Sequence, residues 1–188
     1  QGDTDCSSMD PTSTNNWTPI SNFDGTLDGG GKTICGMSIN DTDKNLGLFD
    51  TLGKNSVIFN LHFVKALITN NSISSTYSTG VLAGKASGSI ERVLVDVSSI
   101  VLGNHNLGGL VGVGDEIFIR KSSSSADVKC INFFDTTCGD GTKGTNIGGL
   151  VGKLMGSENF PQVPSVNEHP KNSGISNSFA DGNVSGRE

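Results

Sequence analysis

The sequence predicts an all-β fold in which short parallel strands stack into a β-solenoid of about four or five coils. Three observations lead to this prediction: a repeat of roughly thirty residues, period-2 apolar alternation within each repeat, and an unusual composition. The 188 residues include 26 glycines, and only 17% are charged and 6% aromatic. The apolar residues therefore suit many thin rows better than one thick core, and we expect residues 1–188 to form a single domain.

The first half of each repeat is a short apolar motif flanked by glycines. It reads Gly-Leu-Phe at 47–49, Gly-Val-Leu-Ala-Gly at 80–84, and Gly-Gly-Leu-Val-Gly at both 108–112 and 148–152. The central leucines of these copies are 34, 28 and 40 residues apart. Paired glycines suit tight corners where the backbone needs a positive φ or a close approach. If successive copies stack, the leucines form one internal column: Leu48, Leu82, Leu110 and Leu150.

The second half of each repeat begins with an isoleucine and then alternates, as in Ile90, Val93, Val95 and Val97. Gly, Asn, Asp or Ser residues bound these segments, and none has a helical period of useful length. Two short strands cannot enclose a core alone, so each copy must pack on its neighbours with equivalent strands in parallel. We expect the leading isoleucines to form a second column: Ile34, Ile58, Ile90, Ile119 and Ile175.

The motif at 148–152, with Ile-Ser-Asn-Ser-Phe-Ala-Asp-Gly-Asn-Val-Ser-Gly at 175–186, resembles the GLUG repeat of large bacterial surface proteins. That repeat occurs in adhesins of the filamentous-haemagglutinin kind and in the non-catalytic N-terminal part of proteins like the immunoglobulin A1 protease. The segment from Trp17 to Ile34 resembles the usual start of such arrays, so the resemblance covers about residues 17–186. It implies a right-handed parallel β-helix, and the repeat itself carries no catalytic site.

Two insertions interrupt the last copies, at about 129–146 and 153–174, and both are expected to leave the stack as lateral loops. Loops on a rigid scaffold are a usual place for recognition, although these two could simply cover an edge. Residues 1–22 are expected to cap the first coil, with Trp17 packed over the end of the apolar column. The chain stops where another copy would begin, so we expect a fragment of a longer repeat protein or an element that covers this edge.

Four cysteines are present, and none belongs to the close pairs that are typical of zinc sites. We expect two disulfides, Cys6 with Cys35 and Cys130 with Cys138, which form in an oxidising compartment. Four buried free thiols are the alternative. Together with the resemblance, the disulfides predict a secreted or cell-surface protein, bacterial in origin.

The formal net charge of −6 argues against a nucleic-acid partner, since no basic stripe is present to neutralise phosphates. No apolar run approaches the roughly 20 residues of a transmembrane helix, so membrane insertion is not expected. We expect neither metal nor cofactor. The acidic turn at 24–29 has Cys35 where a calcium-binding EF-hand needs glutamate, and the three histidines are isolated: His62, His105 and His169.

The predicted function is that of an adhesin-like or structural module that binds an extracellular protein or glycan without turnover; its oligomeric state is open. The alternative is a β-helix polysaccharide lyase or glycosidase, which needs clustered carboxylates, or a carboxylate-bound metal with a basic residue. Its candidate residues are Glu91, Arg92, Asp96 and Arg120, although Arg92 and Arg120 lie at different offsets from their leading isoleucines and need not share a face. A third possibility is the targeting domain of a larger secreted protease. No HExxH motif is present, so the chain is not the zinc-protease domain itself.

Overall fold

The computed structural model describes residues 6–8, 16–42, 44–131, 146–155 and 173–185. This part of the chain forms sixteen strands and no helix. Every pair of named strands in it is parallel. The prediction of an all-β fold built from parallel strands is confirmed.

The described strands belong to three sheets. The nine-stranded sheet contains β1 (Thr26–Cys35), β3 (Phe49–Leu52), β4 (Val57–Val64), β6 (Ala83–Val95), β9 (Val111–Arg120), β10 (Ser123–Ser124), β13 (Val151–Met155), β14 (Gly174–Ser176) and β15 (Phe179–Ala180). The five-stranded sheet contains β2 (Ser38–Asp41), β5 (Leu67–Asn70), β7 (Ile100–Gly103), β11 (Asp127–Cys130) and β16 (Val184–Ser185). The two-stranded sheet contains β8 (Leu107–Gly108) and β12 (Ile147–Gly148).

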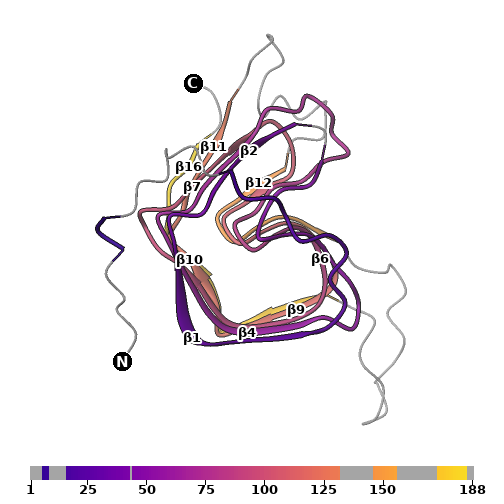
Figure 1. Cartoon of the computed structure of the whole chain (residues 1–188). Helices are drawn as coiled ribbons and strands as arrows, with labels where there is room; N and C mark the ends of the chain where they lie inside the picture. Colours follow the sequence, from indigo (N-terminus) through magenta and orange to yellow (C-terminus); the bar gives the residue numbers. More distant parts are fainter. Residues whose placement is uncertain (1–5, 9–15, 43, 132–145, 156–172, 186–188) are drawn as a thin grey trace.

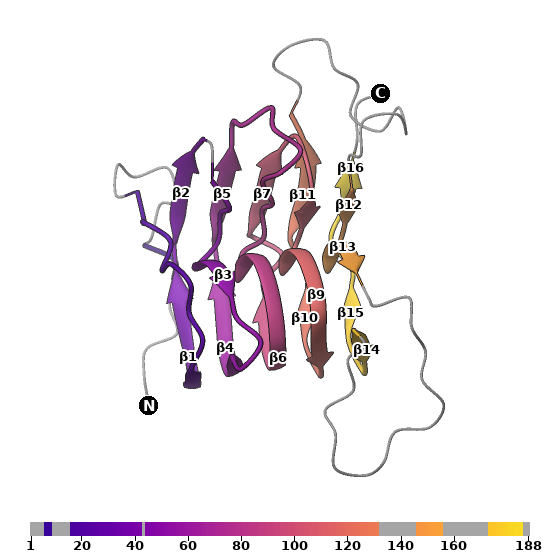
Figure 2. The same cartoon turned by 90° about the vertical axis from the view of Figure 1, so that its right-hand side faces the viewer.

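Neighbouring strands in each sheet come from successive repeats of the sequence. The five-stranded sheet has the order β2-β5-β7-β11-β16, and the main path of the largest sheet is β1-β4-β6-β10-β15. Figure 1 shows successive repeats overlying one another, and Figure 2, turned by 90°, shows their strands side by side. Each repeat therefore supplies the hydrogen-bonding partner of the next.

The four central leucines of the glycine-flanked motif lie next to one another inside the molecule. Backbone hydrogen bonds run from Phe49 N to Leu82 O, from Leu82 N to Leu110 O and from Leu110 N to Leu150 O. All four leucine side chains are buried: Leu48, Leu82, Leu110 and Leu150. The glycine-flanked motif thus supplies one continuous apolar row across the repeats.

Four of the five expected isoleucines also share one row. Ile58 pairs with Ile90, Ile90 with Ile119, and Ile119 with Ile175. The expectation that Ile34 belongs to this row is wrong, because Leu27 pairs with Ile58 and Ile34 pairs with Phe63. The register of β1 shifts between Asp28 and Lys32, across the Gly29-Gly30-Gly31 run. Leu27 precedes this corner and Ile34 follows it, so Leu27 is the residue of the first repeat that belongs to the row.

Close backbone contacts explain the last glycine of the repeated motif. A Cβ atom on Gly112 would lie 2.5 Å from Thr79 N and 2.7 Å from Asn106 O. A Cβ atom on Gly152 would lie 2.5 Å from Leu107 O. Real Cβ atoms do not come this close to backbone, so the glycines permit the dense packing of neighbouring segments.

The two ends of the stack differ. At the N-terminal end a disulfide joins Cys6 to Cys35, the last residue of β1. Isolated bridges join Asn16 to Ser38, and Ile20 and Phe23 to β3. Trp17 lies at this end, where its indole N–H donates to Leu48 O at 3.4 Å. At the other end, several apolar side chains are exposed: Leu154, Met155, Ile175, Phe179 and Val184.

The predicted insertions lie mostly outside the described residues, and their boundaries shift where they are visible. Residues 153–155 continue β13 and Gly174 begins β14, since both segments pair in register with β9. Residues 129–130 likewise belong to β11. No cysteine in the described ranges is free. Cys138 lies outside those ranges, so its pairing with Cys130 stays a prediction.

Candidate functional site

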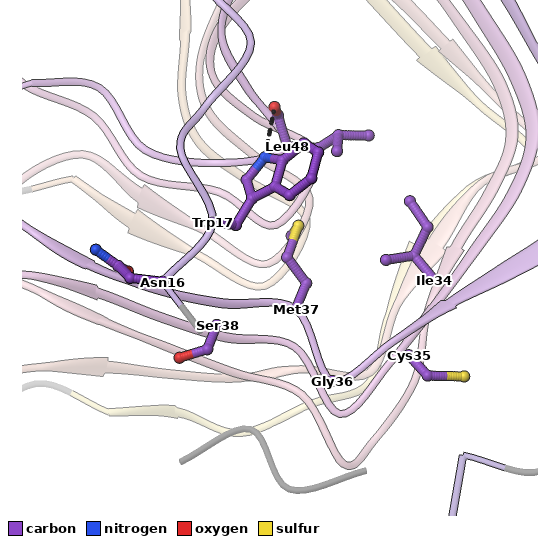
Figure 3. A pocket seen from close by; sticks show the side chains of 8 residues that line it. All are labelled: Asn16, Trp17, Ile34, Cys35, Gly36, Met37, Ser38 and Leu48. Atoms are coloured by element: carbon purple, nitrogen blue, oxygen red, sulfur yellow. Dashed lines mark hydrogen bonds between the residues drawn. The ribbon is translucent and has the colours of Figure 1, made fainter. Parts of the chain in front are cut away.

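An apolar pocket of about 760 Å³ opens at the N-terminal end of the stack (Figure 3). Figure 3 shows the Met37 sulfur beside the indole ring of Trp17, with the Ile34 side chain also directed into the space. None of the described residues that line it is charged; they are Asn16, Trp17, Ile34, Cys35, Gly36, Met37, Ser38 and Leu48. The pocket suits an uncharged apolar group.

The chain builds this pocket where β1 turns into β2. Gly36 makes the turn with a φ of 65°, a left-handed conformation that favours glycine. Asn16 closes one side, because its amide donates to Asn40 O at 3.1 Å and its side-chain oxygen accepts from Asn40 N at 2.7 Å. Both ends of the Asn16 side chain are therefore held by the Asn40 backbone, and Ser38 is a further polar residue in the lining.

A charged cluster, comprising Glu91, Arg92, Arg120 and Lys121, lies on the outside of the largest sheet. Arg92 Nη1 donates to Glu91 Oε1. Arg120 Nη2 is 3.5 Å from Glu91 Oε2, and Lys121 Nζ is 3.9 Å from Glu91 Oε1. Three cations thus share one carboxylate.

The backbone explains why residues at different offsets meet on one surface. Glu91 pairs with Arg120 across β6 and β9, and Arg92 and Lys121 come next in their respective segments. Arg92 has a φ of 51° and Lys121 a φ of 49°. A left-handed residue interrupts period-2 alternation, so two successive side chains face outward before the inward Val93. Arg92 and Arg120 thus differ in register, as their offsets predicted, but both contact Glu91 on the same outer surface.

Asp96, the fourth residue proposed for an enzyme, forms a local turn apart from the charged cluster. Its carboxylate accepts hydrogen bonds from Ser98 N at 2.9 Å and Ser98 Oγ at 2.6 Å. These bonds close a local turn, which is the usual role of aspartate at such positions. The structure thus assembles Glu91 with the two arginines and leaves Asp96 in a separate turn.

A series of side-chain hydrogen bonds connects the charged cluster to the first repeat. Arg92 Nε donates to Asn60 Oδ1 at 2.6 Å, and Asn60 Nδ2 donates to Asp28 Oδ1 at 3.0 Å. The pKa of Asp28 is lowered, first by the hydrogen bond from Gly30 N–H and then by the bond from Asn60. Asp28 is therefore ionised at neutral pH, whereas the general acid of a glycosidase needs a raised pKa.

The remaining candidates from the sequence are dispersed. His105 Nε2 lies 3.1 Å from Ile73 O, His62 is half-buried on β4, and His169 is outside the described residues. Within the described ranges, no group of three or more His, Cys, Asp or Glu residues could hold a metal ion. No helix in those ranges is long and apolar enough to cross a membrane. Sequence patterns identified neither the pocket nor the meeting of Lys121 with Glu91, Arg92 and Arg120.

Comparison with known proteins gives partial likenesses. No family model and no solved structure matches the chain. Halomucin of Haloquadratum walsbyi is 43% identical over 95 residues, which cover 50% of this chain and 1% of that protein. The immunoglobulin A1 proteases of two Streptococcus pneumoniae strains are 31% and 30% identical over 115 and 117 residues, or 55% and 56% of this chain.

The chain spans 6% of the length of each immunoglobulin A1 protease and 1% of halomucin. The likeness to the protease agrees with part of the resemblance stated from the sequence. Membership of the GLUG repeat family stays a prediction, because no family model matches. The relatives support a region of a surface or secreted protein, and they do not identify which activity this chain contributes.

Proposed function

We propose that the chain is a right-handed parallel β-helix module of the GLUG type, which presents a binding surface outside the cell and catalyses no reaction. The observation that carries this proposal is the likeness of about half of the chain to short stretches of two much longer kinds of protein. The names of these relatives, halomucin and immunoglobulin A1 protease, are those of surface or secreted proteins. A bacterial or archaeal surface protein is the corresponding context for this module.

The arrangement of strands supports a rigid display module. Parallel pairing connects each repeat to the next through the largest and the five-stranded sheets. The Cys6–Cys35 disulfide fits an oxidising compartment. Side chains on the outer faces are spaced regularly along such a stack, with about 4.8 Å between neighbouring strands. A repeating ligand, such as a glycan, or an extended protein surface fits this spacing.

A second candidate is a targeting region within a larger secreted protease. The two immunoglobulin A1 protease matches favour it, since each covers more than half of this chain. In that case the module would hold a protein substrate while a separate domain cuts it. A β-helix glycosidase or lyase is the enzymatic alternative. The feature that favours it is the contact of Glu91 with Arg92 and Arg120.

One binding experiment separates these functions. The immobilised chain is exposed to a panel of glycans and to human immunoglobulin A1, and retained ligand and new reducing ends are both measured. We expect retention of at least one glycan without new reducing ends. Retention of immunoglobulin A1 alone would favour the targeting region, and release of reducing ends would favour the enzyme. No retention of any ligand would contradict the proposed binding function.

A further inference from the structure

We propose that Arg92, Arg120 and Lys121 form a binding site for the sulfate or carboxylate groups of an anionic polysaccharide. The inference rests on the proposed function as a non-catalytic binding module and names the ligand class and the residues. The polysaccharide would cross the strands along the stack, because the three cations come from two successive repeats.

The charged cluster has an excess of positive charge on a chain whose formal net charge is −6. One carboxylate, Glu91, faces three cations in it. The side chains of Arg92, Arg120 and Lys121 are 47%, 58% and 61% exposed, against 25% for Glu91. An anionic ligand can therefore reach the cations while the carboxylate is partly covered.

The three cations keep hydrogen-bonding capacity for a ligand. Lys121 Nζ is 3.9 Å from Glu91, which is beyond hydrogen-bond distance, and Arg120 Nη2 is at the limit with 3.5 Å. Arg92 uses Nε and Nη1, and its Nη2 group has no partner among the described residues. Guanidinium groups match the paired oxygens of sulfate and carboxylate, so two arginines and a lysine suit these anions.

The backbone at Arg92 and Lys121 favours a different residue type. Asn60, Arg92, Lys121 and Asn177 occupy equivalent corner positions in successive repeats, with φ values of 56°, 51°, 49° and 48°. Asparagine tolerates this left-handed conformation much better than arginine or lysine. The outer members of the row are asparagines, whereas the two middle members are cations. Lys65 and Glu116 adopt the same conformation elsewhere, so the conformation alone marks no site; what distinguishes this row is that its two cations are neighbours and contact the same carboxylate.

Neighbouring groups hold Arg92 in position. Its Nε donates to Asn60 at 2.6 Å, and Asn60 in turn donates to Asp28 at 3.0 Å. Glu91 attracts the other two cations toward the same place. The site is thus organised before a ligand arrives, which reduces the entropy lost on binding.

Other surface cations provide a matched control. Lys44 pairs with Asp41 at 2.5 Å, and Lys129 pairs with Asp127 at 3.1 Å. Each of these lysines has its own carboxylate and a side chain of similar exposure, 43% and 44%. They carry the same charge as members of the charged cluster but lack its excess of cations.

The test compares two double variants that lose equal charge: Arg120→Ala/Lys121→Ala and Lys44→Ala/Lys129→Ala. Binding of the whole chain to dextran sulfate, hyaluronan and uncharged dextran is measured by biolayer interferometry at several salt concentrations. Dextran sulfate and dextran differ only in sulfate, and hyaluronan supplies carboxylate. We expect binding to at least one anionic polymer, weakened about ten-fold by the first double variant and less than about two-fold by the second.

Arg92→Asn separates a binding role from a structural one. Asparagine suits the left-handed corner, so this variant should keep or raise the melting temperature while it weakens binding to the anionic polymer. Equal losses in both double variants would overturn the proposed site, as would no binding to either anionic polymer. If the unchanged chain retains an uncharged glycan or immunoglobulin A1 but binds neither anionic polymer, the binding module stands and only the anion site fails.

Discussion

Ile90 and Ile175 belong to the same row but have opposite environments. Ile90 lies between Ile58 and Ile119 and is 0% exposed, whereas Ile175 is 42% exposed and pairs, among the described residues, with Ile119 alone. Both residues begin the same alternating motif in the sequence. The difference shows that burial in this molecule depends on having a repeat on each side, and only secondarily on the motif itself.

The contrast extends to whole strands. β6 pairs with β3, β4, β9 and β10 along its length. β15 pairs with β10 alone, and Phe179 in it is 60% exposed. Stability in such a stack is distributed unevenly, since a central strand opens only when contacts on two sides are lost.

Replacing Ile90 by alanine should cause the largest change. Removing a fully buried isoleucine side chain costs about 4 kcal/mol of unfolding free energy when its surroundings cannot collapse. The matched variant Ile175→Ala should cost less than about 1 kcal/mol, because that side chain is already partly in water. Urea unfolding followed by circular dichroism measures both. Similar costs for the two variants would break the comparison between centre and end.

The disulfide at the N-terminal end should contribute somewhat less. Cys6 and Cys35 are 29 residues apart, and a loop of this size gives about 3.6 kcal/mol in the chain-entropy model. Cys6→Ser/Cys35→Ser should therefore lower the unfolding free energy by about that amount. Hydrogen exchange should accelerate most in β1 and least in β14. Uniform acceleration in all strands would show that the two ends are not independent.

Glycine substitutions sharpen the same comparison on the backbone. Gly112→Ala places a Cβ atom 2.5 Å from Thr79 N, so the packed segments must move apart, at a cost of about 2 kcal/mol. At Gly174 the nearest atoms to such a Cβ are 3.5 Å away on Phe118, an ordinary contact. Gly174→Ala should leave the thermal midpoint nearly unchanged. A larger loss at Gly174 than at Gly112 would contradict the packing described here.

Acid should produce the smallest effect. The pKa of Asp28 is lowered from 3.8, mainly by hydrogen bonds from Gly30 and Asn60. A carboxyl group with a lowered pKa stabilises the fold when the pH is above its ordinary pKa. This contribution disappears as the pH falls through the lowered pKa. Asn60→Ala should move the pKa of Asp28 back toward 3.8, as measured by carbon NMR titration. An unchanged pKa of Asp28 in that variant would show that the hydrogen bond from Asn60 does not lower it.

The sequence was sufficient to predict the parallel strands and the leucine row. Both follow from a glycine-flanked motif that returns at intervals of 28 to 40 residues, and a repeated motif is visible without coordinates. The isoleucine row was predicted only in part. The glycine run 29–31 turns a corner inside β1, and no apolar period reveals on which side of a corner the paired residue lies.

The charged cluster escaped prediction for a related reason. Period-2 reasoning assumes an extended backbone, and a left-handed residue such as Arg92 breaks that period without any glycine to signal it. The apolar pocket depends on Trp17 lying over Leu48, a contact between segments that share no repeat motif. The contacts at corners and caps could therefore be found only from the structure, whereas the pairing of the repeated strands could be predicted from the sequence.

The central claim is that successive repeats lie directly over one another, and methyl NMR tests it most directly. In a sample labelled only at isoleucine δ-methyl groups, Ile90 should show nuclear Overhauser contacts to both Ile58 and Ile119, because paired parallel strands are about 4.8 Å apart. Ile58 and Ile119, two strands apart at roughly 10 Å, should show no direct contact. Absence of both contacts to Ile90, or a strong contact between Ile58 and Ile119, would contradict the stacking of repeats.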